Sequence, residues 1–369
     1  MKILHISGAN GWGGNEQQII YLLPKLNELG IENVVCGLSG SILEKECKKH
    51  KINFVPFKGK KLKKFSNFKQ LSELTKTEKP DIIQLHTSDS LMFFLLADLF
   101  FNIKGKLVFS KKGVGVSGSF FSKIKYNHPR IDAILCVSKM VEDSFGKILN
   151  EKTKQKTLII NDSVSLDVLN FERTLNIREL YNIPNHKVLV GNIANHTNAK
   201  DLFTLIDALA EVKFKHHRDD IIFVQVGEFS KKTDKLKNYA TQKGVLKDVI
   251  FMNKIKNASS LNKQFDIFLL TSQREGGPTS LLEAMLMETP TVSTKVGVVP
   301  DVIENGVNGF VAEIKDYKKL AEYVITLVDN KLLQQQFGLK SKVLIQEKFT
   351  ASYIAGEIKN EFEKIAAKN

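Results

Sequence analysis

The sequence predicts an α/β protein of two doubly wound domains, each a parallel sheet covered by helices on both faces. Short runs rich in Val and Ile alternate with amphipathic stretches of ten or more residues along nearly the whole chain. That alternation is typical of βαβ units. The 369 residues, 43% of them hydrophobic, exceed one ordinary core and suit two domains of about 150–200 residues each.

The predicted strands fall into two series. The first series covers residues 2–7, 33–37, 53–57, 81–86, 106–110, 133–137 and 157–160. The second covers residues 188–193, 221–226, 249–252, 267–271, 291–293 and 309–311. Amphipathic stretches such as 202–214 and 317–328 predict the intervening helices.

The alternation stops over residues 161–185, a polar segment that ends in the turn signal Pro184-Asn185. We therefore predict Rossmann-like domains at residues 1–165 and 166–350, and a C-terminal helix at 351–369 that packs back on the first domain. Open α/β sheets bind ligands at the carboxyl ends of their strands, so we expect the two domains to face a ligand cleft.

Composition and termini exclude several classes. Three widely spaced cysteines form no CxxC pair, which argues against a disulfide framework or thiolate metal site and fits a reducing cytoplasm. The N-terminus runs directly into a strand pattern without an apolar signal region. The longest apolar run, residues 91–103, is too short to cross a bilayer, which takes about 20 residues; we predict a buried helix there.

The net charge is +14, and residues 1–170 carry +10 of it. Such an excess favours an anionic partner: nucleic acid, acidic lipid headgroups or a phosphorylated substrate. Nucleic acid is the least favoured of these, because the lysines match no known nucleic-acid-binding motif.

One motif carries chemistry: the strand at 267–271 runs into SQREGGPTSLLEAMLMETPTV. Gly276 and Gly277 let the backbone approach a ligand closely, and Pro278 is tolerated at a helix start. A helix over 279–287 would point its free N–H groups at a phosphate or at hydroxyls. Glu275 and Glu283 flank this loop, and carboxylates accept hydrogen bonds from vicinal hydroxyls. The structural alternative is a capping box, Ser280-x-x-Glu283, with Glu275 on the surface.

The pattern from Asp266 to Glu313 resembles the donor half of retaining GT-B glycosyltransferases of glycosyltransferase family 4. The positions that match its motif are Ser272, Glu275, Gly276, Pro278, Glu283, Ala284, Met285, Pro290, Gly297, Asp301, Gly306 and Gly309. The resemblance implies a GT-B fold, with an N-terminal acceptor domain and a C-terminal nucleotide-sugar domain. It also implies donor contacts: Glu275 and the backbone of Gly276, Gly277, Pro278 and Thr279 to the sugar and diphosphate, the amides of Ser280 and Leu281 to the diphosphate, and Glu283 to the ribose.

The loop after the strand at 188–193 both fits and departs from the family pattern, which has an Arg followed five residues later by a Lys. Lys200 stands at the Lys position, and Asn195 replaces the Arg. An amide brings no charge, which removes a charge-assisted contact worth about 1.5–3 kcal/mol. We expect His196 and Lys200 to compensate. The alternative for Lys200 is a solvated residue at a helix start.

The first half contributes weaker signals. Gly13, Gly14 and Glu16 resemble the family's GG-x-E loop, which lies against the donor phosphates and the acceptor, although a plain tight turn remains an alternative. His86 matches a family histidine that faces the transferred sugar. The alternative is that His86 has only a structural role. Lys112-Gly113 and Asn161-Asp162 depart from the family's His-Gly and Asn-Gly pairs; the first departure is expected to shift acceptor binding toward an anionic group.

The chemistry implied is retaining transfer of a hexosyl or N-acetylhexosaminyl group from a nucleotide sugar, with UDP favoured, to a glycan or lipid-linked acceptor. Lys200 and the helix start would stabilise the leaving diphosphate. The sequence contains no DxD motif and no metal-ligand cluster, so we expect no metal and no cofactor. Catalytic roles are expected for Lys200, Glu275 and His86.

The run KGKKLKKFSNFK, residues 58–69, holds six lysines, two phenylalanines and no acid. It predicts a patch that binds the acceptor or an anionic membrane, at Lys58, Lys60, Lys61, Lys63 and Lys64. The alternative is a solvated loop without a partner. We expect a cytoplasmic protein, peripheral on the inner membrane face, in polysaccharide or envelope-glycan synthesis. A GT-B sugar-nucleotide epimerase and a non-catalytic scaffold, suggested by Asn195, stay open as alternatives.

Overall fold

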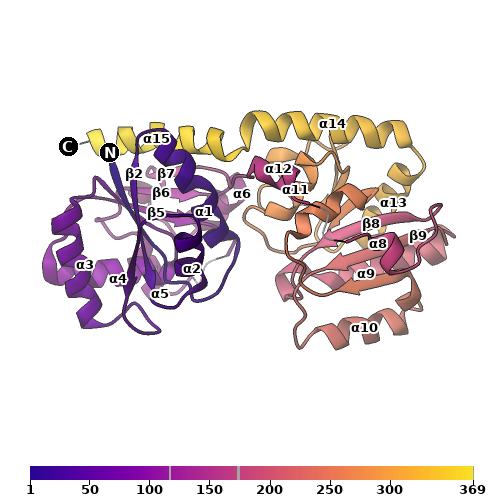
Figure 1. Ribbon diagram of the computed structural model, residues 1–369, viewed down its shortest axis with the longest axis horizontal. Coiled ribbons are helices and arrows are strands. Elements are labelled where there is room, and N and C mark those ends of the chain that lie inside the picture. The colour runs from indigo at the N-terminus through magenta and orange to yellow at the C-terminus, as the bar shows by residue number, and fades with distance from the viewer. Residues whose placement is uncertain (116–117, 173–174, 369) are drawn as a thin grey trace. The chain divides into compact units, whose positions relative to one another are not determined.

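The protein forms two compact α/β units, as the sequence predicts (Figure 1). The computed structural model describes residues 1–115, 118–172 and 175–368. One unit is Met1–Ser163 with Ala351–Asn369, and the other is Val164–Thr350. The division falls two residues before the predicted boundary. Residues 173 and 174 of the polar segment 161–185 lie outside the described part.

The first unit is built on a seven-stranded parallel sheet of order β3-β2-β1-β4-β5-β6-β7. The strands are β1 (Lys2–Ile6), β2 (Glu32–Leu38), β3 (Phe54–Phe57), β4 (Ile82–Leu85), β5 (Lys106–Lys111), β6 (Ala133–Cys136) and β7 (Thr157–Ile159). Its helices are α1 (Gly14–Glu28), α2 (Ile42–Lys49), α3 (Phe65–Glu78), α4 (Ser88–Phe101), α5 (Phe120–Tyr126), α6 (Lys139–Gly146), α7 (Glu151–Lys154) and α15 (Ala351–Ala367).

The C-terminal helix α15 belongs to the first unit although 187 residues of the second unit precede it. Its buried Ile354, Ile358 and Phe362 share a core cluster with Ile19 and Leu23 of α1, and Figure 1 shows α15 running beside α1. The chain thus re-enters its first unit through apolar packing.

The second unit has a six-stranded parallel sheet of order β10-β9-β8-β11-β12-β13. The strands are β8 (Val188–Ile193), β9 (Ile221–Val226), β10 (Val249–Met252), β11 (Ile267–Leu270), β12 (Thr291–Thr294) and β13 (Phe310–Ala312). The α-helices are α8 (Ile177–Leu180), α9 (Leu202–Ala210), α10 (Thr233–Gln242), α11 (Thr279–Leu286), α12 (Val299–Val302), α13 (Tyr317–Val328) and α14 (Lys331–Lys348). Short 3₁₀ helices cover Leu166–Asn170, Asn198–Lys200, Leu246–Asp248 and Ala258–Gln264.

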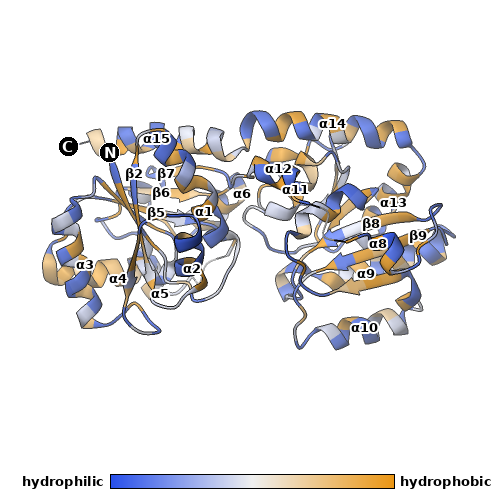
Figure 2. Ribbon diagram, in the orientation of Figure 1, coloured by the Kyte–Doolittle hydropathy of each residue, from blue (hydrophilic) through white to orange (hydrophobic). Residues whose placement is uncertain are grey.

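Every predicted strand is present, with each end within one residue of its predicted position. The central strands are buried on both faces, whereas the edge strands β3 and β7 each carry an exposed residue; Figure 2 shows the strands as largely hydrophobic. The predicted helix over 202–214 is instead divided into α9 and a π-helical turn, Glu211–Lys215.

The prediction of a buried helix at residues 91–103 is only partly right. The helix α4 forms, capped by Thr87 and Ser90, and Phe93, Phe94 and Ala97 are buried. Its last turn is not buried, because Leu99 and Phe100 are 78% and 60% exposed. An apolar run longer than the core it covers leaves its end in solvent.

Candidate functional site

The candidate donor site is built on two loops of the second unit, which follow the neighbouring strands β8 and β11. The Gln273 amide donates to the Ala199 carbonyl at 2.8 Å. The Thr271 hydroxyl contacts the Asp201 carbonyl at 3.2 Å, and the Thr294 hydroxyl holds the Ser272 carbonyl at 2.6 Å. The first two bonds fix the two loops to each other, and the third ties the loop after β11 to the end of β12. Both loops thus lie at the carboxyl end of the sheet, where parallel sheets bind ligands.

Lys200 and Glu275, 75 positions apart in the chain, form an ion pair across these loops. Lys200 Nζ lies 2.6 Å from Glu275 Oε1, and the Ser272 hydroxyl donates to the same oxygen at 2.6 Å. The Glu275 side chain is 10% exposed and that of Lys200 is 25% exposed. Lys200 is therefore a positioned, partly buried cation and not a solvated helix-start residue.

The helix α11 begins at Thr279 with Pro278 as its N-cap, and no side chain caps it. Ser280 is therefore the second helical residue, so the alternative of a capping box between Ser280 and Glu283 is wrong. Glu283 is 8% exposed in the middle of α11. The first N–H groups of α11 lack helical acceptors, as at any helix start, and carry the positive end of the helix dipole.

Gly297 packs directly against the loop that carries Glu275 and Gly276. Its backbone has φ +53°, and a Cβ built on it would lie 2.2 Å from the Gly276 carbonyl oxygen and 2.9 Å from that of Glu275. Only glycine fits both the backbone conformation and the space. The loop after β12 thereby sets the position of the carboxylate loop after β11.

The expectation that His196 compensates for Asn195 is wrong. His196 is 2% exposed, and its ring nitrogens bond Thr233 Oγ1 at 2.8 Å and Gln225 Oε1 at 2.7 Å. Burial lowers its pKa, so the ring is neutral and fully used within the core. Asn195 itself is exposed, and its oxygen accepts from the Glu228 amide at 2.9 Å.

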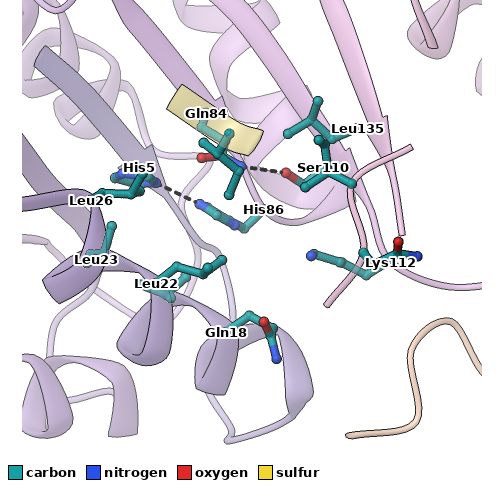
Figure 3. Close-up of a pocket in the computed structure, with 14 residues that line it drawn as sticks. His5, Gln18, Leu22, Leu23, Leu26, Gln84, His86, Ser110, Lys112 and Leu135 are labelled. Carbon is teal, nitrogen blue, oxygen red and sulfur yellow. Dashed lines mark hydrogen bonds between the residues drawn. The ribbon is translucent and has the colours of Figure 1, made fainter. Parts of the chain in front are cut away.

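In the first unit, His86 at the end of β4 lies beside His5 of β1 (Figure 3). His5 Nδ1 and His86 Nε2 are 3.1 Å apart, and His5 Nε2 is 2.9 Å from Asn33 Oδ1. The Asn33 amide nitrogen donates to the Ile31 carbonyl, so its oxygen faces His5 and accepts from Nε2. His86 is 8% exposed, and a cavity of about 20 Å³, room for one water molecule, lies between these rings, α1 and β5.

The hydrogen-bond network assigns the protons of both rings. Burial lowers the pKa of His5 to about 4, so the ring is neutral and its Nδ1 accepts. His86 must then donate from Nε2. Burial, with the neighbouring His5 and Lys112, also holds the pKa of His86 well below its usual value. The neutral His86 therefore keeps Nδ1 as an acceptor, which suits a hydroxyl and not a phosphate.

The two departures at Lys112 and Asp162 form one ion pair. Lys112 Nζ lies 2.6 Å from Asp162 Oδ1, and the side chains are 24% and 7% exposed. Lys112 is therefore a paired, partly buried cation, and the expectation that it shifts acceptor binding toward an anionic group stays a prediction.

The glycine loop before α1 places Gly13 as its N-cap and Gly14 as its first residue. Glu16 in that first turn is 4% exposed and accepts from the Ser7 hydroxyl at 3.2 Å. Burial raises the pKa of its carboxyl. The Asn15 amide donates to the His86 carbonyl at 2.7 Å, which ties this loop to the end of β4; its contact with donor phosphates stays a prediction.

The basic run has five exposed lysines, Lys58, Lys60, Lys61, Lys63 and Lys64. Asn67 holds the loop by bonding Lys58 through both backbone groups and the Leu62 carbonyl, and Leu62 is buried. Of the two phenylalanines in this run, Phe68 is buried, with 8% of its surface exposed. Phe65 is 63% exposed, and its ring centroid lies 5.9 Å from that of Phe100.

Sequence reasoning missed His5 and the steric role of Gly297. A polar residue among the otherwise apolar residues 3–6 of the KILHI strand is the signal that would have pointed to His5. Within the described residues, no three His, Cys, Asp or Glu side chains cluster closely enough to hold a metal ion. No helix in the same part of the chain is both long and apolar enough to cross a membrane.

Comparison with known proteins gives matches in both halves. The model of glycosyl transferases group 1 matches residues 174–343, and that of glycosyltransferase family 4 matches residues 12–156. N-acetyl-alpha-D-glucosaminyl L-malate synthase of Bacillus anthracis is 23% identical over 297 residues, 78% of this chain and 76% of that protein. Poly(ribitol-phosphate) alpha-N-acetylglucosaminyltransferase of Staphylococcus aureus is 28% identical over 216 residues, 56% of this chain and 43% of its own length.

Solved structures share the whole fold. A glycosyltransferase from Rickettsia africae superposes with TM-score 0.85 at 20% identity, covering 100% of this chain and 99% of that one. Anabaena Alr3699/HepE in complex with UDP gives TM-score 0.83 at 19% identity, covering 99% and 100%. The two family models match one half of the chain each, and together with the fold they establish that the chain belongs to the family-4-type glycosyltransferases of GT-B fold.

Proposed function

We propose that this glycosyltransferase moves a sugar from a UDP-sugar to a glycan or lipid-linked acceptor, with retention of configuration and without a metal ion. The observation that carries the proposal is the Lys200–Glu275 pair, fixed beside the start of α11. UDP and UDP-glucose are bound in structures of the HepE protein that shares this fold, which supports the choice of UDP.

The pair supplies both kinds of group that a sugar diphosphate needs. An ammonium has three N–H donors, and Glu275 takes one from Lys200, which leaves two for diphosphate oxygens. Glu275 accepts from Lys200 and Ser272 through one oxygen, which leaves the other for sugar hydroxyls. The Glu283 carboxylate would accept from the ribose hydroxyls.

The transfer breaks the bond between C1 of the sugar and the diphosphate oxygen, and negative charge grows on the leaving group. The Lys200 cation and the first N–H groups of α11 stabilise that charge, each charge-assisted bond contributing about 1.5–3 kcal/mol. The leaving phosphate accepts the proton of the acceptor hydroxyl, so no side-chain base is assigned. His86 Nδ1 accepts from a hydroxyl of the sugar undergoing transfer.

The acceptor is proposed to belong to polysaccharide or envelope-glycan synthesis and to lie at an anionic membrane surface. An O-antigen biosynthesis glycosyltransferase of Escherichia coli, WclY, is 24% identical over 235 residues, which supports the acceptor class. The exposed lysines at Lys58–Lys64 support the surface.

A thermal-shift panel of UDP, GDP, ADP and their sugars tests the donor assignment. A bound donor raises the melting temperature by mass action, so we expect UDP-sugars to give the largest shift. Glu283→Ala should abolish it and Lys200→Met should reduce it, while Lys340→Met, at an exposed position of α14, should leave it unchanged. A full shift in Glu283→Ala would overturn the ribose assignment.

Product analysis with and without acceptor separates the alternatives. Glycosylated product that appears only with acceptor supports transfer. Altered nucleotide sugar without acceptor would indicate an epimerase, and donor binding without any product would indicate a non-catalytic scaffold.

A further inference from the structure

The helix α5 presents a group of apolar side chains to solvent. Phe120, Phe121 and Ile124 are 72%, 79% and 50% exposed, and the two rings meet edge to face with centroids 6.1 Å apart. Single exposed apolar residues are ordinary, but a contiguous group on one short element marks a contact surface.

The outward orientation of these residues is held by packing at the other end of α5. Tyr126 is 6% exposed, with ring centroids 5.5 Å from Phe109 and 4.9 Å from Phe145. Its hydroxyl donates to Ser88 Oγ at 3.0 Å. Tyr126 thus fixes the last residue of the helix to the core, while Phe120 and Phe121 at its first turn remain exposed.

The chain around α5 is rich in cations. Residues 99–131 contain seven Lys and Arg and no Asp or Glu, and two of the seven are paired with acids outside that range, Lys112 with Asp162 and Arg130 with Asp98 and Asp132. Lys123 is exposed within the helix, and Lys125 donates to Ser88 Oγ at 2.6 Å. Exposed aromatic side chains among cations complement an anionic lipid surface, where rings sit at the headgroup level and lysines meet lipid phosphates.

We propose that α5 is a membrane-docking element that inserts Phe120, Phe121 and Ile124 into the interface of an anionic bilayer. The inference rests on the membrane-surface part of the proposed function and names the element responsible, which is distinct from the Lys58–Lys64 loop. A seven-residue helix gives shallow, reversible insertion of about 5–10 Å.

The position of α5 connects docking to the acceptor. Lys125 and Tyr126 both contact Ser88, two positions after His86 and the first residue of α4. Docking through α5 therefore brings the lipid surface next to the candidate sugar-facing histidine. A lipid-linked acceptor would then reach the site from the bilayer without leaving it.

Vesicle flotation tests the proposal on the full chain, with phosphatidylcholine vesicles that either contain or lack phosphatidylglycerol. Phe120→Ser/Phe121→Ser should weaken partition to the anionic vesicles about tenfold or more, because two inserted rings are lost. Lys123→Glu should weaken binding only where anionic lipid is present. Leu180→Ser, at a 57% exposed position on α8 beside Glu179, is the matched control and should bind as the unmodified chain does.

A second measurement reports insertion directly. Trp12 is the single tryptophan, so Phe121→Trp adds one reporter, which bromine-labelled acyl chains should quench beyond the level of the unmodified chain. The UDP-induced thermal shift should persist in all these variants, which separates a docking failure from a failure of the donor assignment. Unchanged partition of the double variant, or absence of added quenching, would overturn the proposal. So would light scattering that showed α5 joining two copies of the chain in solution.

Discussion

Replacing Gly297 by alanine tests how the donor loop is positioned. The new Cβ would lie 2.2 Å from the Gly276 carbonyl oxygen, roughly 1.2–1.8 Å inside ordinary contact distance. The backbone φ of +53° adds strain of about 1–2 kcal/mol for a residue other than glycine. Overpacking against a fixed backbone adds about 1–3 kcal/mol, so we expect a total loss of about 2–5 kcal/mol of unfolding free energy.

The steric clash displaces the loop that carries Glu275. The Gly297→Ala substitution should therefore reduce transfer activity more than it reduces the unfolding free energy. A displacement of about 1 Å in a reacting geometry costs roughly a hundredfold in rate. Transfer from UDP-sugar should therefore fall about that much in Gly297→Ala, with a smaller UDP-induced thermal shift. Urea unfolding and product formation measure the two effects separately.

Gly306→Ala is the matched control. Gly306 also has positive φ, +81°, but a Cβ there meets nothing within 4 Å. Gly306→Ala should lower the unfolding free energy only by the backbone strain, about 1–2 kcal/mol, and should retain near-normal transfer activity. Equal activity losses in the two variants would refute the steric argument, as would normal activity in Gly297→Ala.

Three further predictions concern the first unit. Lys112→Met should lower the unfolding free energy measured in urea by about 2–3 kcal/mol, because it leaves the Asp162 carboxylate buried and unpaired. The double variant Lys112→Met/Asp162→Asn should recover most of that loss. A double-mutant cycle that showed no coupling energy between the two positions would contradict a stabilising ion pair. Burial lowers the pKa of His5 to about 4, against 6.5 in the unfolded chain. Between pH 4 and pH 6.5 the unfolded state therefore binds more protons than the folded state. The folded state keeps its full stability above pH 6.5, and its unfolding free energy falls by up to about 3 kcal/mol as the pH falls toward 4. Urea midpoints against pH check this, with exposed His50→Gln as a variant that should keep the slope; a flat profile in the unmodified chain argues against a buried neutral His5. Changing Lys60, Lys61, Lys63 and Lys64 to glutamine should reduce co-sedimentation with anionic vesicles, each lysine contributing about 1 kcal/mol near the surface, and equal recovery with neutral vesicles rules out an electrostatic contact.

The sequence predicted the strands to within one residue because a buried parallel strand has a local sequence pattern, a run rich in Val and Ile between two amphipathic helical segments. The sequence predicted the burial of side chains less well, because burial depends on which other elements of the fold cover a helix or loop. The apolar run in α4 is an example, because the run itself does not reveal that the core ends before Leu99 and Phe100. Phe68 is the converse case, a residue in a basic surface run that turns into the core.

By itself, the sequence determined the parallel α/β architecture and the glycine-rich, carboxylate-flanked helix start in the second half, because both depend on residue types at short spacing. Only the tertiary structure decided the partners of the charged and polar residues. It paired Lys200 with Glu275 and Lys112 with Asp162, placed His5 against His86, and committed His196 to the core. These contacts join positions 29 to 81 apart in the chain, and no local pattern encodes such distances. The order of strands in a sheet, and not the order of residues in the chain, brings the side chains together.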